Sequence, residues 1–207
     1  MNALRNCEEN SNLLGWVRAS DAIGDFTYPY VLENQEFCME YISTTVIKYT
    51  KKLYIRMLAD GIQYYTDRYS WNAGGTITKS LKNKNQLIVD EFSDGAFQAY
   101  TVRLEEASQK GKIYIIDAEF FIDGCNYVEH QYLGLTNSFP VRNLTLCVRV
   151  ANNLKLLECK YNMYGHSVDR VPKISKVIKP KSGIIEHTFK NLVIGERYNL
   201  EWRVVKK

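Results

Sequence analysis

The chain has 207 residues, with 45% apolar and 24% charged residues, as in an ordinary globular protein. Only 4 Pro and 12 Gly argue against a long disordered segment, and no apolar run approaches the length needed to cross a bilayer. The net charge of +4 is divided unevenly: residues 1–140 carry 13 Lys+Arg and 18 Asp+Glu (13 − 18 = −5), and residues 141–207 carry 14 and 5 (14 − 5 = +9). Such asymmetry concerns partners rather than fold.

The cysteines and the N-terminal residues predict a cytoplasmic protein with reduced thiols. There are five cysteines (Cys7, Cys38, Cys125, Cys147 and Cys159), an odd number without a C-x-x-C pair, which fits neither a disulfide framework nor a zinc site. Residues 1–15 lack the apolar core of a signal peptide. We therefore expect no metal and no cofactor.

Strand signals begin near residue 36. Residues 1–35 are hard to interpret, and residues 3–14 allow at most one short helix. Beyond them, strands are predicted at 37–42, 45–49, 53–58, 62–65, 76–78, 86–90 and 96–104, because these runs are rich in β-branched and aromatic residues. Asp60-Gly61 separates two such runs and Asp94-Gly95 precedes another. Asp-Gly at such positions favours a hairpin turn.

Residues 112–132 form the clearest unit, in which two long strand-like runs flank Asp123-Gly124. A two-residue turn there predicts a hairpin that places Asp117 opposite His130, with Glu119 on the same face. Two carboxylates and an imidazole could hold a metal or supply an acid and a base. A solvated outer face with a cross-strand charge pair is the simpler interpretation, since no nucleophile or further strong ligand accompanies them.

Residues 134–140 are turn-rich, end in Pro140 and mark the point where the charge changes sign. Beyond them, period-2 alternation predicts strands at 141–150, 154–161, 171–179, 184–189 and 198–205. We therefore predict an all-β, mostly antiparallel fold with two β-sandwich-like (immunoglobulin-like) units. The first is a mildly acidic domain over residues 1–140, and the second is a small basic domain over residues 141–207. Because the second is small for a full sandwich, a core shared with the first is the alternative.

The basic unit holds the candidate binding residues, Lys173, Lys176, Lys179 and Lys181. Pro180 indicates an edge strand or a strand end, and lysines on an edge strand prevent edge-to-edge aggregation. The functional alternative is a surface for a phosphate backbone, with Tyr161, Tyr164 and His166 as stacking partners. Elsewhere, Trp71 in a polar loop is either a contact anchor or a cap on the core, whereas the alternation around Trp202 predicts a core position.

The sequence contains no G-x-S-x-G, H-E-x-x-H or G-x-x-x-x-G-K-[ST] motif, and it has only three histidines. We therefore predict a non-enzymatic recognition or scaffolding module that binds another macromolecule through loops and its basic C-terminal face. The expected partner is a protein or a second copy of the chain. The alternatives are nucleic-acid binding by the basic unit, and a hydrolase or metal site at Asp117, Glu119 and His130.

Overall fold

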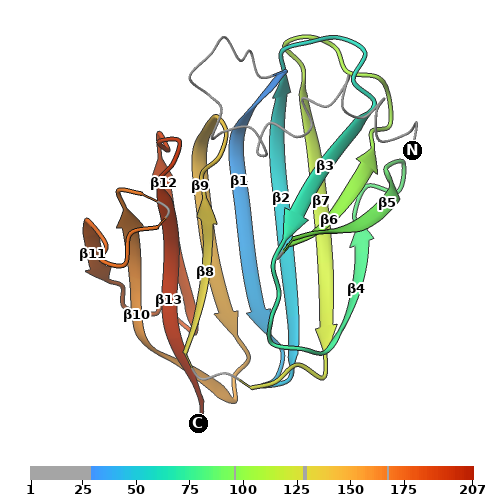
Figure 1. Ribbon diagram of the computed structural model, residues 1–207. Helices are drawn as coiled ribbons and strands as arrows, with labels where there is room; N and C mark the ends of the chain where they lie inside the picture. The colour runs from blue at the N-terminus through green and yellow to red at the C-terminus, as the bar shows by residue number, and fades with distance from the viewer. Residues whose placement is uncertain (1–28, 96, 128–129, 167) are drawn as a thin grey trace.

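The computed structural model describes residues 29–95, 97–127, 130–166 and 168–207. These residues form strands β1 to β13 joined by turns and loops, without a helix, so the all-β prediction is confirmed (Figure 1). None of them contributes a helix with the length and hydrophobicity needed to cross a bilayer. The short helix expected within residues 3–14 lies outside the described residues, and the immunoglobulin-like arrangement stays a prediction.

One large sheet of six strands runs through the whole molecule, in the order β12-β9-β1-β2-β7-β4. Among the described pairings, only that of β1 with β9 is parallel. The strands are β12 (Ile184–Lys190), β9 (Val141–Val150), β1 (Tyr30–Tyr41), β2 (Val46–Met57), β7 (Ile113–Asp123) and β4 (Thr76–Leu81).

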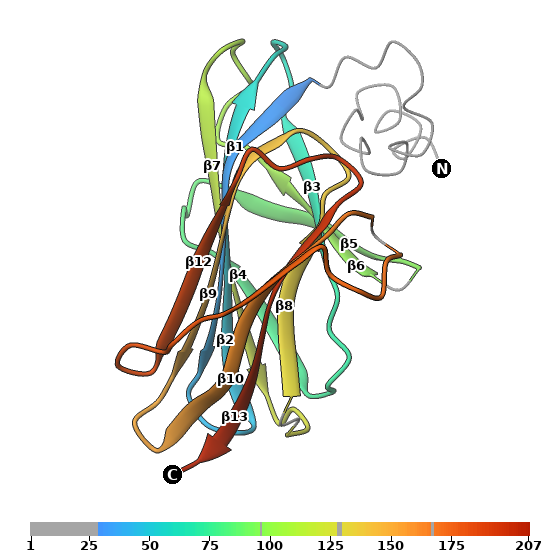
Figure 2. The same cartoon turned by 90° about the vertical axis from the view of Figure 1, so that its left-hand side faces the viewer.

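Two smaller sheets cover one face of the large sheet, as the side view shows (Figure 2). The four-stranded sheet has the order β11-β10-β13-β8, and the three-stranded sheet has the order β3-β6-β5. Their strands are β11 (Ile174–Val177), β10 (Leu154–Tyr164), β13 (Arg197–Lys206), β8 (His130–Thr136), β3 (Tyr64–Tyr69), β6 (Phe97–Arg103) and β5 (Leu87–Asp94).

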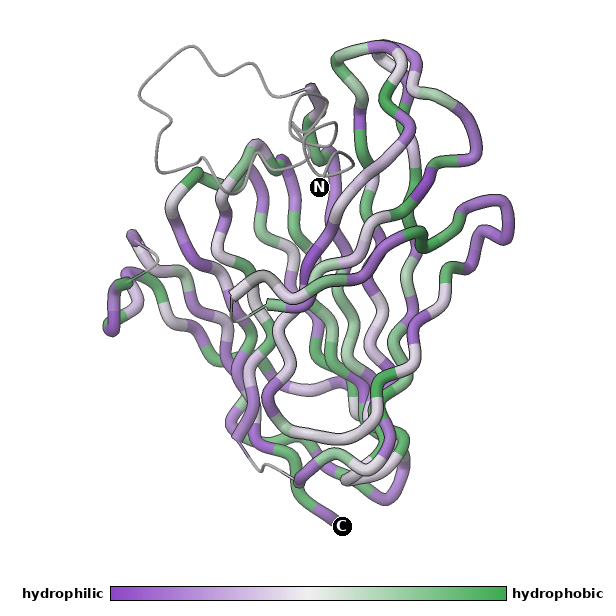
Figure 3. Tube along the Cα trace, turned by 45° about the vertical axis from the view of Figure 1, so that its right-hand side comes forward, coloured by the Kyte–Doolittle hydropathy of each residue, from purple (hydrophilic) through white to green (hydrophobic). Residues whose placement is uncertain are grey.

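The core fills the space between the large sheet and its two covers. Side chains alternate between the two faces of a strand, and the hydropathy along the strands alternates accordingly (Figure 3). Leu144, Leu146 and Val148 of β9 are fully buried, as are Leu200 and Val204 of β13. These residues belong to one apolar cluster that also includes residues of the first 140. One core therefore serves both of the predicted units.

The hairpin predicted within residues 112–132 is wrong. β7 pairs with β2 and β4, whereas β8 pairs with β13 in another sheet. Gly124 does adopt the positive φ, 68°, that a tight turn requires of it, so the local signal for a turn was correct. β7 and β8 do not pair because β2 and β4 already occupy the two edges of β7. The hairpin predicted at Asp60-Gly61 is not formed either, since β2 and β3 lie in different sheets. Asp94-Gly95, by contrast, does join the paired strands β5 and β6.

The segment 134–140 connects the predicted units tightly instead of separating them. It carries the chain from β8 in the four-stranded sheet to β9 in the large sheet. Asn137 is fully buried, and its backbone exchanges hydrogen bonds with residues that precede β13: the N–H donates to the Glu196 carbonyl at 2.8 Å, and the carbonyl accepts from Gly195 at 2.7 Å. The segment is a fixed crossover within one structural unit.

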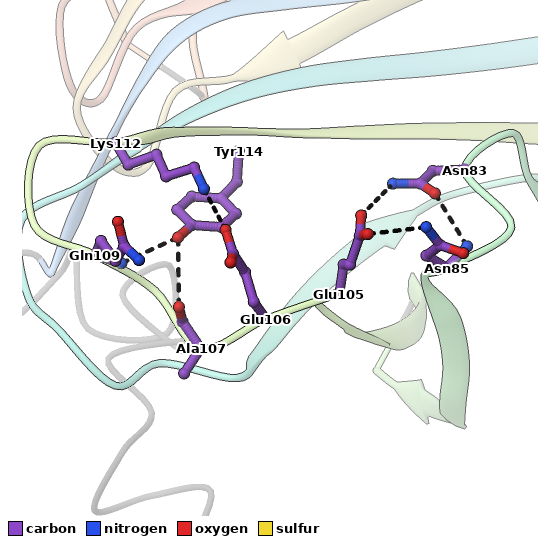
Figure 4. A network of polar contacts seen from close by, with 8 residues as sticks. All are labelled: Asn83, Asn85, Glu105, Glu106, Ala107, Gln109, Lys112 and Tyr114. Atoms are coloured by element: carbon purple, nitrogen blue, oxygen red, sulfur yellow. Dashed lines mark hydrogen bonds and ion pairs between the residues drawn. The ribbon is translucent and has the colours of Figure 1, made fainter.

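The connection between β6 and β7 is a loop held by side chains (Figure 4). Glu105 accepts a hydrogen bond from the side chain of Asn85 at 2.8 Å, and the hydroxyl of Tyr114 accepts one from the backbone N–H of Gln109 at 3.0 Å. Lys112 forms an ion pair with Glu106. These contacts hold the loop over the start of β7.

A single core predicts cooperative unfolding that depends on residues beyond position 140. Leu146→Ala should lower the free energy of unfolding by about 2–5 kcal/mol, because it leaves a cavity among fully buried side chains. Urea denaturation followed by tryptophan fluorescence and by circular dichroism should give one coincident transition at a lower midpoint. The matched control is Val193→Ala, whose side chain is largely exposed. Two separate transitions, only one of them shifted, would contradict a shared core.

Candidate functional site

A cleft of about 620 Å³ opens between the two covering sheets. Its floor is the large sheet, and its walls are β3 with the following loop on one side and β8 on the other. Figure 1 shows β3 and β8 in front of the large sheet, with β1 visible between them. The floor residues are Gln35, Phe37, Met39, Tyr49, Lys51, Phe120 and Ile122, and the walls include Tyr65 to Asn72 and Gln131 to Thr136.

A lysine lies buried on the floor of this cleft. Lys51 occupies an inward-facing position of β2, in the same alternation as Ile47, Leu53 and Ile55, and only 6% of its side chain is exposed. Its ammonium group lies 2.6 Å from a carboxylate oxygen of Asp67 and donates to the Arg68 carbonyl at 2.8 Å. It also lies 4.9 Å from the centre of the Phe37 ring. Each contact offsets part of the cost of removing the charge from water.

Asp67 links this lysine to the three-stranded sheet. The hydroxyl of Tyr100 donates at 2.7 Å to Oδ2 of Asp67, the same oxygen that lies 2.6 Å from the Lys51 ammonium. Burial, together with the negative charge of Asp67, raises the pKa of Tyr100 well above its usual range, so the hydroxyl remains a donor. Lys51, Asp67 and Tyr100 therefore form a polar chain between β2, β3 and β6 at the inner end of the cleft.

The rest of the floor combines aromatic rings with one unsatisfied amide. Phe120 packs 5.5 Å from Tyr49 and 4.8 Å from Tyr69, measured between ring centres. Gln35 is 2% exposed, and its amide oxygen accepts no hydrogen bond from any described residue. A buried acceptor without a donor is costly, so the Gln35 oxygen is suited to a donor supplied by a ligand.

One wall of the cleft is a sheet edge. β8 lies at the end of the four-stranded sheet and pairs with β13, and its opposite edge joins no described strand. Tyr132 of β8 is 67% exposed and lines the cleft. Across from it, Trp71 packs against the core, lines the cleft and donates its ring N–H to the Gly74 carbonyl at 2.6 Å. By contrast, Trp202 is buried in the core as predicted.

The predicted cluster of Asp117, Glu119 and His130 is not formed. Asp117 and Glu119 lie on the outer face of β7 and pair with Lys82 at 3.2 Å and Lys48 at 2.8 Å, respectively. His130 lies on β8, in a different sheet. Among the described residues, no three His, Cys, Asp or Glu side chains are grouped to hold a metal ion. The error follows from the mistaken hairpin, because the predicted cluster required β7 to pair with β8.

The four lysines of the basic unit lie on and around the edge strand β11. Lys176 is in β11, and Lys173, Lys179 and Lys181 flank it; all four are exposed. Lys173 forms an ion pair with Glu196. Together with a hydrogen bond from Tyr198, this pair lowers the pKa of Glu196 even though burial acts in the opposite direction. An edge position agrees with protection of the sheet edge.

The three predicted stacking residues differ in accessibility. Tyr161 is half-buried and lies parallel to His187 of β12, with ring centres 3.8 Å apart. Tyr164 is buried beneath the guanidinium group of Arg197, which lies 3.9 Å from its ring centre. His166 is exposed in the loop after β10. The structure therefore does not bring the three rings together as one open surface, and their role in binding stays a prediction.

Comparison with known proteins gives only distant likenesses. No family model matches the chain, and no curated protein matches it. It is similar to an M1 zinc metallopeptidase from Deinococcus radiodurans, with 10% sequence identity and a TM-score of 0.45 over 86% of this chain and 43% of that one. It is also similar to a mutant M1 zinc metallopeptidase from the same organism bound to a Tyr-Ser-Ala substrate. Here the sequence identity is 8% and the TM-score is 0.45, over 84% of this chain and 42% of that one. The chain spans less than half the length of these solved chains, and no functional assignment follows from likenesses this distant.

The buried ion pair predicts a large difference between two lysines of β2. Lys51→Met should lower the free energy of unfolding by about 3–5 kcal/mol, because it leaves the Asp67 carboxylate buried without its counter-ion. The matched control is Lys48→Met, since Lys48 faces outward and pairs with Glu119 where water screens both charges. Chemical denaturation should show a much smaller loss for the control. Equal losses in the two variants would contradict the role assigned to Lys51.

The stacked His187 predicts a pH-dependent stability. Burial lowers the pKa of His187, and the nearby Lys176 lowers it further, so the folded state favours the neutral ring. The contribution of the neutral ring to stability is complete above the pKa of about 6.5 that His187 has in the unfolded chain, and it is lost as the pH falls below that value. The urea midpoint should therefore decrease between about pH 7.5 and about pH 5.5. His187→Phe should flatten this dependence, whereas His130→Phe on β8 should retain it; equal slopes in the two variants would exclude His187 as the source.

Proposed function

We propose that this protein is a non-enzymatic recognition module that binds an extended segment of a partner protein in the cleft between β3 and β8. The observation that carries this proposal is the outer edge of β8, which pairs with no described strand and borders a cavity of about 620 Å³. That volume lies within the range of about 300–1,000 Å³ that is typical of ligand sites. The cleft has both components of peptide recognition, a backbone edge and a pocket for side chains.

The edge of β8 would supply the backbone contacts. An exposed sheet edge accepts an extended peptide as an additional strand, and the main-chain hydrogen bonds provide affinity. β8 contributes six consecutive residues, Gln131 to Thr136, to the wall of the cleft. A peptide aligned with them would extend the four-stranded sheet toward β3 and cover the part of the large sheet that neither cover reaches.

The floor of the cleft would supply specificity. Side chains of a strand alternate, so every second residue of the bound peptide would point toward the aromatic rings of Phe37, Tyr49 and Phe120. An apolar or aromatic residue fits this lining. The Gln35 amide oxygen, buried and without a described donor, would accept a hydrogen bond from a polar group of the same peptide.

The buried pair of Lys51 and Asp67 favours binding over catalysis. The Lys51 ammonium is engaged by Asp67 and by a backbone carbonyl, and Asp67 is engaged by Lys51 and Tyr100. Both groups therefore have structural partners already. The lysines around β11 would attract an acidic partner and increase its rate of association. The odd number of cysteines supports a cytoplasmic location for this activity.

A selection from a library of displayed random peptides tests the proposal. We expect enriched peptides with apolar residues at alternating positions. Tyr132→Ala and Trp71→Ala should each weaken the binding of such a peptide about tenfold, since aromatic residues at an interface account for much of its affinity. Bound peptide should also slow amide hydrogen exchange along β8, which is the specific sign of an added strand.

The matched control for these variants is Phe121→Ala. Phe121 is an aromatic residue of β7 that is 42% exposed, but it lies on the outer face of the large sheet, away from the cleft. Peptide binding should be unchanged in this variant. An equal loss with Phe121→Ala, or slowed exchange confined to strands other than β8, would overturn the proposal.

A further inference from the structure

Two cysteines lie side by side on the face of the large sheet that the covers leave open. Cys38 is in β1 and Cys147 is in β9, and the parallel register pairs these two residues directly. Their neighbours Phe37, Met39, Leu146 and Val148 point into the core, so alternation directs both thiols outward. Cys38 is half-buried, and Cys147 is 4% exposed.

The spacing of the strands suits a covalent bond between these thiols. Neighbouring strands lie about 4.8 Å apart, and the Cα atoms of a disulfide are separated by about 4.4–6.8 Å. The ladder between β1 and β9 continues on both sides of the pair, from Asn34 with Asn143 to Tyr41 with Val150. The strand spacing therefore places the Cα atoms of Cys38 and Cys147 within the range that a disulfide spans.

The surroundings of the pair favour a thiolate at Cys147. A hydrogen bond from Cys38 lowers the pKa of Cys147, and the positive charge of Arg149 lowers it further, against burial and the charge of Glu186. The same hydrogen bond raises the pKa of Cys38, which burial and the charge of Glu40 raise further. Of the two thiols, Cys147 is therefore the one that loses its proton more readily. A thiolate beside a cation is the reactive form of cysteine.

The other two described cysteines lack this arrangement. Burial raises the pKa of Cys125, and it raises that of Cys159 to about 11. The Cys159 thiol donates to the Leu157 carbonyl at 3.4 Å. Neither cysteine faces another cysteine across a described strand pair, so both serve as internal controls for the reactivity of Cys147.

We infer that Cys38 and Cys147 form a redox-active dithiol that closes to an intramolecular disulfide on reaction with a hydroperoxide. The Cys147 thiolate attacks the O–O bond of hydrogen peroxide, which gives a Cys147 sulfenic acid and hydroxide. The Cys38 thiol then attacks the Cys147 sulfur, forms the S–S bond and releases the sulfenic oxygen as water. The two thiols together lose two electrons, and one peroxide is reduced to two waters: the Cys38 proton leaves in the water formed from the sulfenic oxygen, and the hydroxide takes up from solvent the proton that Cys147 released on ionising.

The test is to map the disulfide after oxidation of the folded full-length protein by hydrogen peroxide. Each cysteine falls in a different tryptic peptide, since Lys or Arg residues separate all five. Remaining thiols are blocked with N-ethylmaleimide before digestion. We expect the peptide of residues 19–48 to be linked to that of residues 143–149, with the loss of two hydrogens and with full reversal by dithiothreitol. A disulfide that involves another cysteine in preference, or none at all, would overturn the inference.

Variants separate the two steps. In Cys38→Ser, the Cys147 sulfenic acid should persist and be trapped by dimedone, whereas in Cys147→Ser the remaining Cys38 should react far more slowly with peroxide. Cys159→Ser should still form the linked peptide. Dimedone labelling at Cys38 in place of Cys147 would overturn the assigned order of attack.

A second measurement on the unmutated protein does not depend on the folding of any variant. Phenylarsine oxide bridges two thiols only when they are neighbours. It should protect Cys38 and Cys147 together from N-ethylmaleimide, one arsenic per chain, without protecting Cys125 or Cys159. Maleimide labelling of Cys38 and Cys147 that is unaffected by the arsenical would contradict their proximity and thus the inference.

Discussion

The parallel pairing of β1 with β9 is the constraint on which the rest of the structure depends. It joins strands that lie about a hundred residues apart in the sequence, and it makes one sheet from the acidic and basic portions of the chain. Antiparallel neighbours can be connected by a short turn, whereas a parallel pair requires a long crossover. Here the crossover includes three further strands of the large sheet (β2, β4 and β7), all three strands of the three-stranded sheet, and β8. The charge asymmetry is therefore a property of one molecule with one core.

The cleft follows from this architecture. The four-stranded sheet packs over β9 and β12, and the three-stranded sheet packs over β2 and β7, as the shared apolar cluster and the contact between Tyr100 and Phe120 indicate. The cleft remains between the two covers, over parts of β1, β2 and β7. Gln35 and Lys51, the polar residues of the inner face of the large sheet, are buried on the floor of that cleft, where Lys51 pairs with Asp67 and the Gln35 oxygen accepts no hydrogen bond from a described residue. Beside the same cleft, the outer edge of β8 pairs with no strand of the described part of the chain.

Sequence reasoning located most strands but not their neighbours. Alternation is local, so it identified strands such as 141–150 and the core position of Trp202. Pairing depends on all the strands of the protein. The turn at Asp123-Gly124 does not produce a hairpin of β7 with β8, because β2 and β4 occupy both edges of β7. The sequence does contain one signal for the cleft. Lys51 shares the apolar period of Ile47, Tyr49, Leu53 and Ile55, and a cation at such a buried position requires a partner. The identity of that partner, Asp67 in another sheet, depends on topology.

β1 connects the two proposed activities, because its opposite faces serve different roles. Phe37 and Met39 form part of the cleft floor, and Cys38 between them points to the other side of the sheet. A disulfide to Cys147 would add a covalent link where backbone hydrogen bonds already fix the spacing of β1 and β9. Oxidation should therefore leave the positions of the floor residues nearly unchanged, while it restricts the separation of the two strands on which the single core depends. The disulfide would act on the persistence of the fold more than on the shape of the cleft.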